Sequence, residues 1–202
     1  RKPVGRVSIV TPGGLPVEAN VVDACIGEGC AQCAVRKDAG DDADVTDGVL
    51  VYARVEHAGS GTGAAGSKGV PARESEVSVD GGVGVGRVTL PGLEQPVGAA
   101  AVNATPRAMI TSAVREVCAA HGFSGNIAVT IAVPEGVALA EKTFNPHLGI
   151  EDGISILGTT GIVEPRSLAA LRDSIELEIR QHAAMGRRGV VLTPGNYGAQ
   201  FI

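Results

Sequence analysis

The stretch KTFNPHLGIEDGISILGTTGIVEP, residues 142–165, places a short apolar run between two loops rich in Asn, Thr, Gly and Pro. Breakers bound this run at residues 153–157, which predicts a buried strand. Ser167 resembles a helix N-cap, and Gly186 is a natural helix end. A second apolar run at residues 190–193 predicts another strand. These segments together predict a strand, helix, strand crossover with parallel strands.

The helix of this unit is expected to pack one apolar face against its sheet, because apolar positions recur at helical spacing. These positions are Leu168, Leu171, Ile175, Ile179 and His182.

Both predicted strands lead into glycine-rich loops. Ligands bind at the carboxyl edge of open parallel sheets, so the loops predict a binding site, although tight turns alone would also explain the glycines. The candidate cofactor-binding residues are Gly158, Thr159, Thr160, Gly161, Gly195, Asn196 and Tyr197.

Composition limits the possible classes of protein. The chain has 202 residues, a hydrophobic content of 44% and a net charge of -5, which favour a globular protein over a nucleic-acid or lipid-surface binder. It contains no apolar run long enough to span a bilayer and does not open with a signal-peptide pattern. We therefore expect a cytoplasmic protein with no nucleic-acid or membrane partner.

The preceding part of the chain predicts an antiparallel-rich mixture of strands and helix. A hairpin is expected from residues 4–11 and 15–22, followed by strands at 50–56, 74–79 and 126–133. The last of these strands alternates, with Ile127, Val129, Ile131 and Val133 expected on one side. Thr105 as N-cap and Pro106 as first helical residue predict a helix that ends at Gly122. Its expected buried positions are Met109, Ile110, Ala113, Val114, Val117 and Cys118.

The predicted fold class is therefore mixed α and β, or α+β. We expect an antiparallel-rich half at residues 1–134 and an incomplete parallel half at residues 135–202, since two parallel strands cannot form a stable sheet alone.

Three cysteines have a spacing that suggests a cofactor. Cys25, Cys30 and Cys33 follow the C-x4-C-x2-C pattern of the first three ligands of a plant-type iron–sulfur loop. Reduced thiols without a cofactor are the more common case in a cytosolic chain.

An acidic segment at residues 37–48 permits two interpretations. Asx turns and solvated charge would explain its aspartates, and so would a negative loop that faces a metal or a sulfonium. The glycine-rich residues 81–86 lack the following helix of a dinucleotide site and predict a close approach of another backbone or a ligand. We expect Asp38, Asp41 and Asp44 to share a cleft with these glycines.

Six ordered blocks of the sequence resemble the cobalt-precorrin-5B (C1)-methyltransferase family of anaerobic cobalamin biosynthesis. They lie at residues 37–48, 81–89, 103–107, 143–150, 153–165 and 194–198. The resemblance implies methylation of a cobalt-bearing corrin precursor at ring carbon C1, with S-adenosylmethionine as donor. It also implies that the segments at both ends of such proteins are absent from this chain.

A corrin precursor carries many carboxylates, so local positive groups should hold it. Arg87, Arg107 and the helix N-terminus beside Asn103 are the candidates, with Asp38, Asp41 and Asp44 in the same cleft. An iron–sulfur protein and a non-catalytic corrinoid-binding fragment are the alternatives.

Overall fold

The computed structural model describes residues 4–40, 45–58, 76–158 and 168–191. Its strands are β1 (Arg6–Val10), β2 (Pro16–Ile26), β3 (Cys30–Arg36), β4 (Leu50–His57), β5 (Val77–Gly81), β6 (Gly84–Val85), β7 (Arg87–Val88), β8 (Ile127–Ala132), β9 (Ile150–Glu151) and β10 (Gly153–Ile154). Its helices are α1 (Ala104–Ala120), α2 (Gly136–Ala140), the 3-10 helix η1 (Asn145–Leu148) and α3 (Leu168–Ala184).

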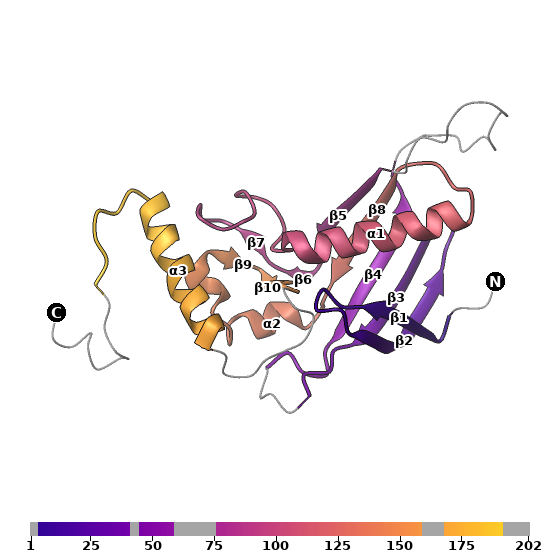
Figure 1. Cartoon of the computed structure of the whole chain (residues 1–202), viewed down its shortest axis with the longest axis horizontal. Helices are drawn as coiled ribbons and strands as arrows, with labels where there is room; N and C mark the ends of the chain where they lie inside the picture. Colours follow the sequence, from indigo (N-terminus) through magenta and orange to yellow (C-terminus); the bar gives the residue numbers. More distant parts are fainter. Residues whose placement is uncertain (1–3, 41–44, 59–75, 159–167, 192–202) are drawn as a thin grey trace.

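A six-stranded sheet in the order β1-β2-β3-β4-β8-β5 forms most of the first half of the molecule (Figure 1). Every neighbouring pair in it is antiparallel except β5 and β8, which are parallel. The α+β class, the opening hairpin and the antiparallel-rich first half are therefore confirmed.

Helix α1 connects the two parallel strands and crosses the sheet (Figure 1). Parallel neighbours require such a crossover, because a tight turn cannot join them. The helix begins at Ala104 with Asn103 as N-cap, so it starts two residues before the predicted position. The crossover of this fold therefore runs through α1.

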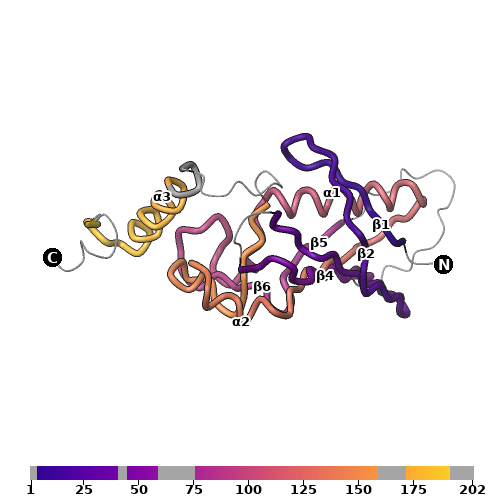
Figure 2. Tube along the Cα trace, turned by 90° about the horizontal axis from the view of Figure 1, so that it is seen from below, coloured from indigo at the N-terminus to yellow at the C-terminus, as the bar shows by residue number. Residues whose placement is uncertain are grey.

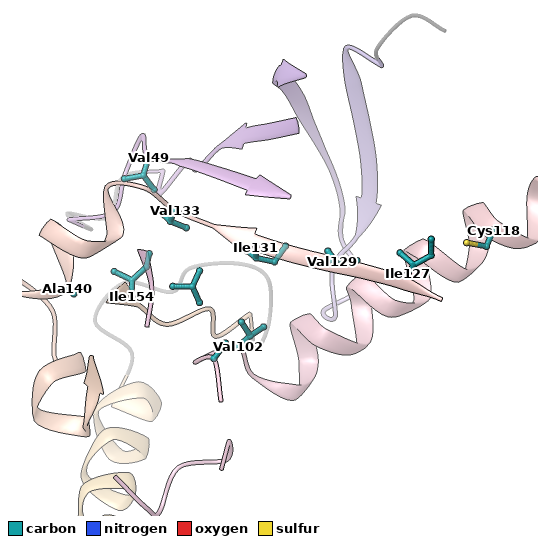
Figure 3. Packing of buried hydrophobic residues seen from close by; sticks show 11 residues of the cluster. Val49, Val102, Cys118, Ile127, Val129, Ile131, Val133, Ala140 and Ile154 are labelled. Carbon is teal, nitrogen blue, oxygen red and sulfur yellow. The ribbon is translucent and has the colours of Figure 1, made fainter. Parts of the chain in front are cut away.

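One face of the sheet forms the core beneath α1. Ile127, Val129 and Ile131 alternate along β8 and point to the same side, as the sequence predicts (Figure 3). Cys118 of α1 and Val102, just before the helix, pack in the same cluster. Ala113 and Val117, both expected to be buried, are exposed, Val117 to 59%, so they lie outside the buried face of the helix.

The glycine-rich residues 81–86 bring three backbones together. Strand β6 pairs in parallel with β10, matching Gly84 to Gly153. A Cβ atom on Gly84, whose φ is +75°, would lie 1.7 Å from the carbonyl oxygen of Val133, and one on Gly136 would lie 2.2 Å from the carbonyl oxygen of Gly84. The predicted close approach of another backbone is confirmed.

The predicted strand, helix, strand unit is correct only in part. The strand expected at residues 153–157 covers only β10, with Ile156 in an isolated parallel bridge to Val102. Val190 and Val191 are exposed and belong to no strand, so the second strand is wrong at these residues. Among the described residues, neither valine has a strand beside it with which to form a ladder. Residues 192–193 lie outside the described part.

Helix α3 is confirmed, but its predicted apolar face is wrong at Ile175 and Ile179, and the side chains of Leu168 and Leu171 lie outside the described part. Ile175 and Ile179 are 40% and 39% exposed, whereas Gln181 is buried. Gln181 packs against Gly92, and its Nε2 donates to the carbonyl oxygen of Leu148 at 2.6 Å. Figure 2 shows this helix at the end of the molecule away from the β1–β2 hairpin.

Hydrophobic packing continues across the expected boundary at residue 134. Ala140 and Ile154 belong to the same cluster as Val85 and Val133. The division into halves at this residue stays a prediction. Within the described ranges, every helix is too short or too polar to cross a lipid bilayer.

We expect Gly84→Ala to destabilise the fold by at least ~4 kcal/mol, because the new Cβ would meet a backbone carbonyl and the residue would keep a left-handed conformation. Chemical denaturation measures the loss. Gly98→Ala is the matched control: its φ is +88° but its Cβ would meet no atom within 4 Å, so only about 1–2 kcal/mol should be lost. Equal losses in the two variants would contradict the packing argument.

Candidate functional site

A cavity of about 610 Å³ lies between α3, η1 and the segment before α1; we name it the α3 cavity. Its charged lining residues are Glu94, Asp173, Glu176 and Arg180. Arg180 donates to Glu176 one helical turn away, so much of its charge is compensated. This cavity has an excess of negative charge.

A second cavity of about 550 Å³ lies between β4, β10 and the base of the acidic segment; we name it the Lys37 cavity. Val49, Val51, Ile154 and Ile156 give it an apolar surface. Its polar lining residues are Lys37, Thr46, Thr143, Asn145 and Ser155. Gly158, the first residue of the predicted cofactor loop, also lines it.

Asn145 and Ser155 line both cavities and form part of the wall between them. Asn145 is buried, and its Nδ2 donates to the carbonyl oxygen of Gly153 at 3.1 Å. The Ser155 hydroxyl donates to Asn145 Oδ1 at 3.3 Å. A buried amide with both of its ends bonded holds η1 against the segment that leads to Gly158.

The predicted cofactor loop and the N-terminus of α1 meet at Gly158. A Cβ atom on this glycine would lie 3.3 Å from the Pro106 ring, and the backbone N–H of Asn103 donates to Ile156 O at 3.0 Å. The structure therefore brings Gly158 and Asn103 together. The other predicted cofactor residues, Thr159, Thr160, Gly161, Gly195, Asn196 and Tyr197, lie outside the described residues.

Asn103 lines the α3 cavity, where its Oδ1 accepts a hydrogen bond from Gln95 Nε2 at 3.0 Å. The first backbone N–H of α1, on Ala104, donates to Glu94 Oε1 at 3.1 Å. A carboxylate of the protein thus already neutralises the positive end of the helix, which lowers its value as an anion site.

Arg107 holds together the backbone segments at the start of α1. Its Nε donates to Val102 O at 2.8 Å, its Nη2 to Ala100 O at 3.2 Å, and its Nη1 to Val79 O. The guanidinium is therefore engaged by the end of β5 and by the segment before the helix. This geometry gives Arg107 a structural role, whatever it contributes to binding.

Arg87 forms a bidentate ion pair with Asp80. The two Nη···Oδ distances are 2.8 and 3.0 Å, and Arg87 Nη2 also donates to Gly81 O. These hydrogen bonds from Arg87 lower the pKa of the Asp80 carboxyl and raise the pKa of Arg87. The pair fixes β7 to the end of β5 across the glycine bend.

At Asp38, the acidic segment does not share a cleft with the glycine-rich residues 81–86. Asp38 and Asp47 line a separate surface cavity with β2 and β3, and no residue from 81–86 lines it. Asp38 Oδ1 accepts from the N–H of Gly40, as in an Asx turn, so local bonding directs it away from the bend. Asp41 and Asp44 lie outside the described residues.

The three cysteines cannot meet at one cluster. Cys25 lies opposite Gln32, two residues from Cys30, so Cys25 and Cys30 share a sheet face. Cys33 lies opposite Ala53 on the other face. The iron–sulfur alternative is therefore wrong. Among the described residues, no group of three His, Cys, Asp or Glu side chains could hold a metal ion.

Sequence reasoning missed several polar residues that line the cavities, among them Lys37, Thr46, Gln95, Asn145 and Ser155. Four of them stand in the blocks that carry the family resemblance, which was an available signal. Gln95 carried no such signal.

Comparison with known proteins relates this chain to one family. The family model CbiD matches residues 1–165. The chain is 41% identical to the cobalt-precorrin-5B C(1)-methyltransferase of Ruminiclostridium cellulolyticum and 44% identical to that of Edwardsiella ictaluri. Each match covers 100% of this chain and 48% or 49% of the relative, so the chain spans about half the length of the curated relatives.

A crystal structure has a related fold. It is the cobalamin biosynthesis protein (cbiD) of Archaeoglobus fulgidus, with 30% sequence identity and a TM-score of 0.55. The match covers 86% of this chain and 50% of that one.

We expect Arg107→Met to lower the free energy of unfolding by about 2–3 kcal/mol, because three backbone carbonyls would lose a charged donor. Arg115→Met, at an exposed position of the same helix, is the control and should cost less than about 0.5 kcal/mol. Urea denaturation compares them. An Arg107 variant as stable as the control would refute the structural role.

Asp80→Asn should remove a pH-dependent part of the stability. The pKa of this carboxyl is lowered in the folded state, so its stabilising contribution is present above its ordinary value of 3.8 and is lost as pH falls through the folded pKa. Urea denaturation from about pH 7 to about pH 2.5 should show the stability gap between wild type and variant closing at the acid end. A gap that stays constant would contradict the assignment.

Proposed function

Because the chain belongs to the CbiD family, we propose that the protein carrying this sequence methylates C1 of cobalt-precorrin-5B, with S-adenosylmethionine as the methyl donor. The observation that carries the proposal is the identity to relatives of that name along the whole chain. The two cavities that meet at Asn145 and Ser155 support it, because the reaction has two substrates.

Methyl transfer from sulfonium to carbon is an in-line displacement that depends mainly on positioning. The donor supplies an electrophilic methyl group, and the protein must align it with the ring carbon. A wall that both cavities share is a suitable place for that alignment. Asn145 stiffens this wall through its bonds to Gly153 and Ser155.

The donor set of the Lys37 cavity fits parts of S-adenosylmethionine. Its volume of about 550 Å³ falls within the range of small-molecule sites, about 300–1,000 Å³. Val49 and Val51 offer an apolar surface for the adenine, and the hydroxyls of Thr46 and Thr143 offer partners for the ribose. Gly158 opens the loop whose backbone N–H groups we propose as further donors.

We propose contacts between individual residues and each of the two reactants. For the cofactor they are Gly158, Thr159, Thr160, Gly161, Gly195, Asn196 and Tyr197, and for the corrin precursor they are Arg87, Asn103, Arg107, Asp38, Asp41 and Asp44. Asn103 has the strongest support among the latter, because it lines the α3 cavity beside the shared wall.

The complete protein that carries this sequence should transfer a labelled methyl group from S-adenosylmethionine to cobalt-precorrin-5B. Chromatography of the corrinoid product with detection of the label measures the transfer. Corrinoid binding without transfer would refute the enzyme and leave a binding protein.

Asn145→Ala should lower kcat/KM roughly tenfold to hundredfold, because a small displacement of the shared wall disturbs the alignment. Asn126→Ala, at an exposed position before β8, is the control and should retain wild-type rates. Equal rates in both variants would exclude the wall from the reaction.

A further inference from the structure

Two thiols project from the face of the six-stranded sheet that lies away from α1. Cys30 lies opposite Glu56, whose neighbour Val55 packs against the core beneath the helix. Cys25 lies opposite Gln32, two residues along β3 from Cys30, so both thiols share the outer face. Both cysteines are unbridged, and neither lines the α3 cavity or the Lys37 cavity. The proposed methyl transfer therefore leaves them without a role.

The turn between β2 and β3 makes the two cysteines diagonal neighbours. The N–H of Gly27 donates to Cys30 O at 2.9 Å, so these residues face each other across the hairpin. Cys25 lies two residues before Gly27 and therefore on the same face. A Cβ atom on Gly27 would lie 3.0 Å from Cys30 Sγ, so this sulfur occupies space that the glycine leaves open. The thiol of Cys30 is thus directed toward the side of the hairpin that carries Cys25.

The spacing of diagonal neighbours favours an atom between the sulfurs over a direct bond. The Cα atoms of such neighbours lie about 7–8 Å apart. A disulfide requires a Cα separation of no more than about 6.8 Å. A metal ion with two sulfur ligands in line holds the sulfurs about 4.6 Å apart, because a metal–sulfur bond is about 2.3 Å long. The hairpin therefore suits a bridging metal ion better than a disulfide.

Arg54 supplies a positive charge beside both thiols. It lies opposite Gln32 on the same face and forms an ion pair with Glu56 at 3.0 Å. The hydrogen bond to Glu56 is the main cause that raises the pKa of Arg54, and the charges of Cys30 and Cys25 contribute to the same shift. The guanidinium thus lies within electrostatic range of both sulfurs and compensates the carboxylate opposite Cys30. A positive neighbour favours the thiolate, which is the form of cysteine that binds metals.

We propose that Cys25 and Cys30 form a two-thiolate site for a soft monovalent metal ion, Cu⁺. Each thiol releases its proton to solvent and forms one sulfur–metal bond, and no electron is transferred. The bound group carries one negative charge, which Arg54 offsets. Thiolates select Cu⁺, for which two sulfur ligands are sufficient. Zn²⁺ takes four ligands, and the described residues offer no group of three.

The test titrates Cu⁺ into the complete, reduced protein in the absence of oxygen, in competition with a colorimetric Cu⁺ chelator. Cys25→Ser and Cys30→Ser should each weaken binding about 100-fold or more, because the second sulfur acts as an intramolecular ligand. Cys33→Ser is the matched control, since Cys33 projects from the opposite face of β3. This variant should bind Cu⁺ as wild type does.

Two measurements on the wild type do not depend on the folding of the variants. X-ray absorption of the bound Cu⁺ should show two sulfur neighbours. Bound Cu⁺ should also protect Cys25 and Cys30, but not Cys33, from alkylation, which peptide mapping by mass spectrometry measures.

Three results would overturn the proposal: equal affinities in all three variants, alkylation of Cys25 and Cys30 that Cu⁺ does not slow, or a Cys25–Cys30 disulfide formed by oxidised glutathione in a protein that binds no Cu⁺. The site is independent of the proposed function, so Cys25→Ser should transfer methyl groups at the wild-type rate. The expected Cu⁺ binding in a wild type without methyl transfer would refute only the enzyme.

Discussion

The backbone contact among Gly84, Gly136 and Gly153 is the constraint on which the rest of the structure depends. At Gly84 a side chain would collide with the carbonyl of Val133, and at Gly153 one would lie 2.4 Å from the backbone of Gly84. Because these three backbone segments approach one another without side chains between them, β10 can pair with β6 while α2 packs over both. This contact sets the position of the segment from Gly153 to Gly158. Residues of that segment line both cavities, so the contact also determines where the cavities form.

Much of the fold was predictable where the pattern is local. The hairpin, the alternation of Ile127, Val129 and Ile131, and the existence of α3 all follow from periodicity and turn residues. The partners of these elements did not follow. Helix α3 contacts η1 through Gln181, because the carbonyl oxygen of Leu148 accepts a hydrogen bond from its side-chain amide. Gly92 permits the close approach of this residue. Helical periodicity contains no such information.

The site was predictable only in outline. Gly158 and Asn103 were named from their motifs, and the structure places them at the same helix N-terminus. Arg107 was named for its charge, yet its donors are directed at backbone carbonyls. A surface arginine and a structural one look the same in sequence, because the difference lies in which carbonyls the fold leaves without partners.

The acidic segment shows that a count of charges does not tell which of them face a cavity. A negative loop that faces a cation was one of two interpretations, but Asp38 is engaged in a local turn and Asp47 accepts from the backbone N–H of Ala39. The cation of the segment, Lys37, lines both the partly apolar Lys37 cavity and the surface cavity that Asp38 and Asp47 line. Exposed carboxylates are screened by salt within about 10 Å, whereas a charge in a partly enclosed apolar site is screened far less. The net charge of -5 therefore does not give the field at any one cavity, since the nearest charges and their surroundings set it.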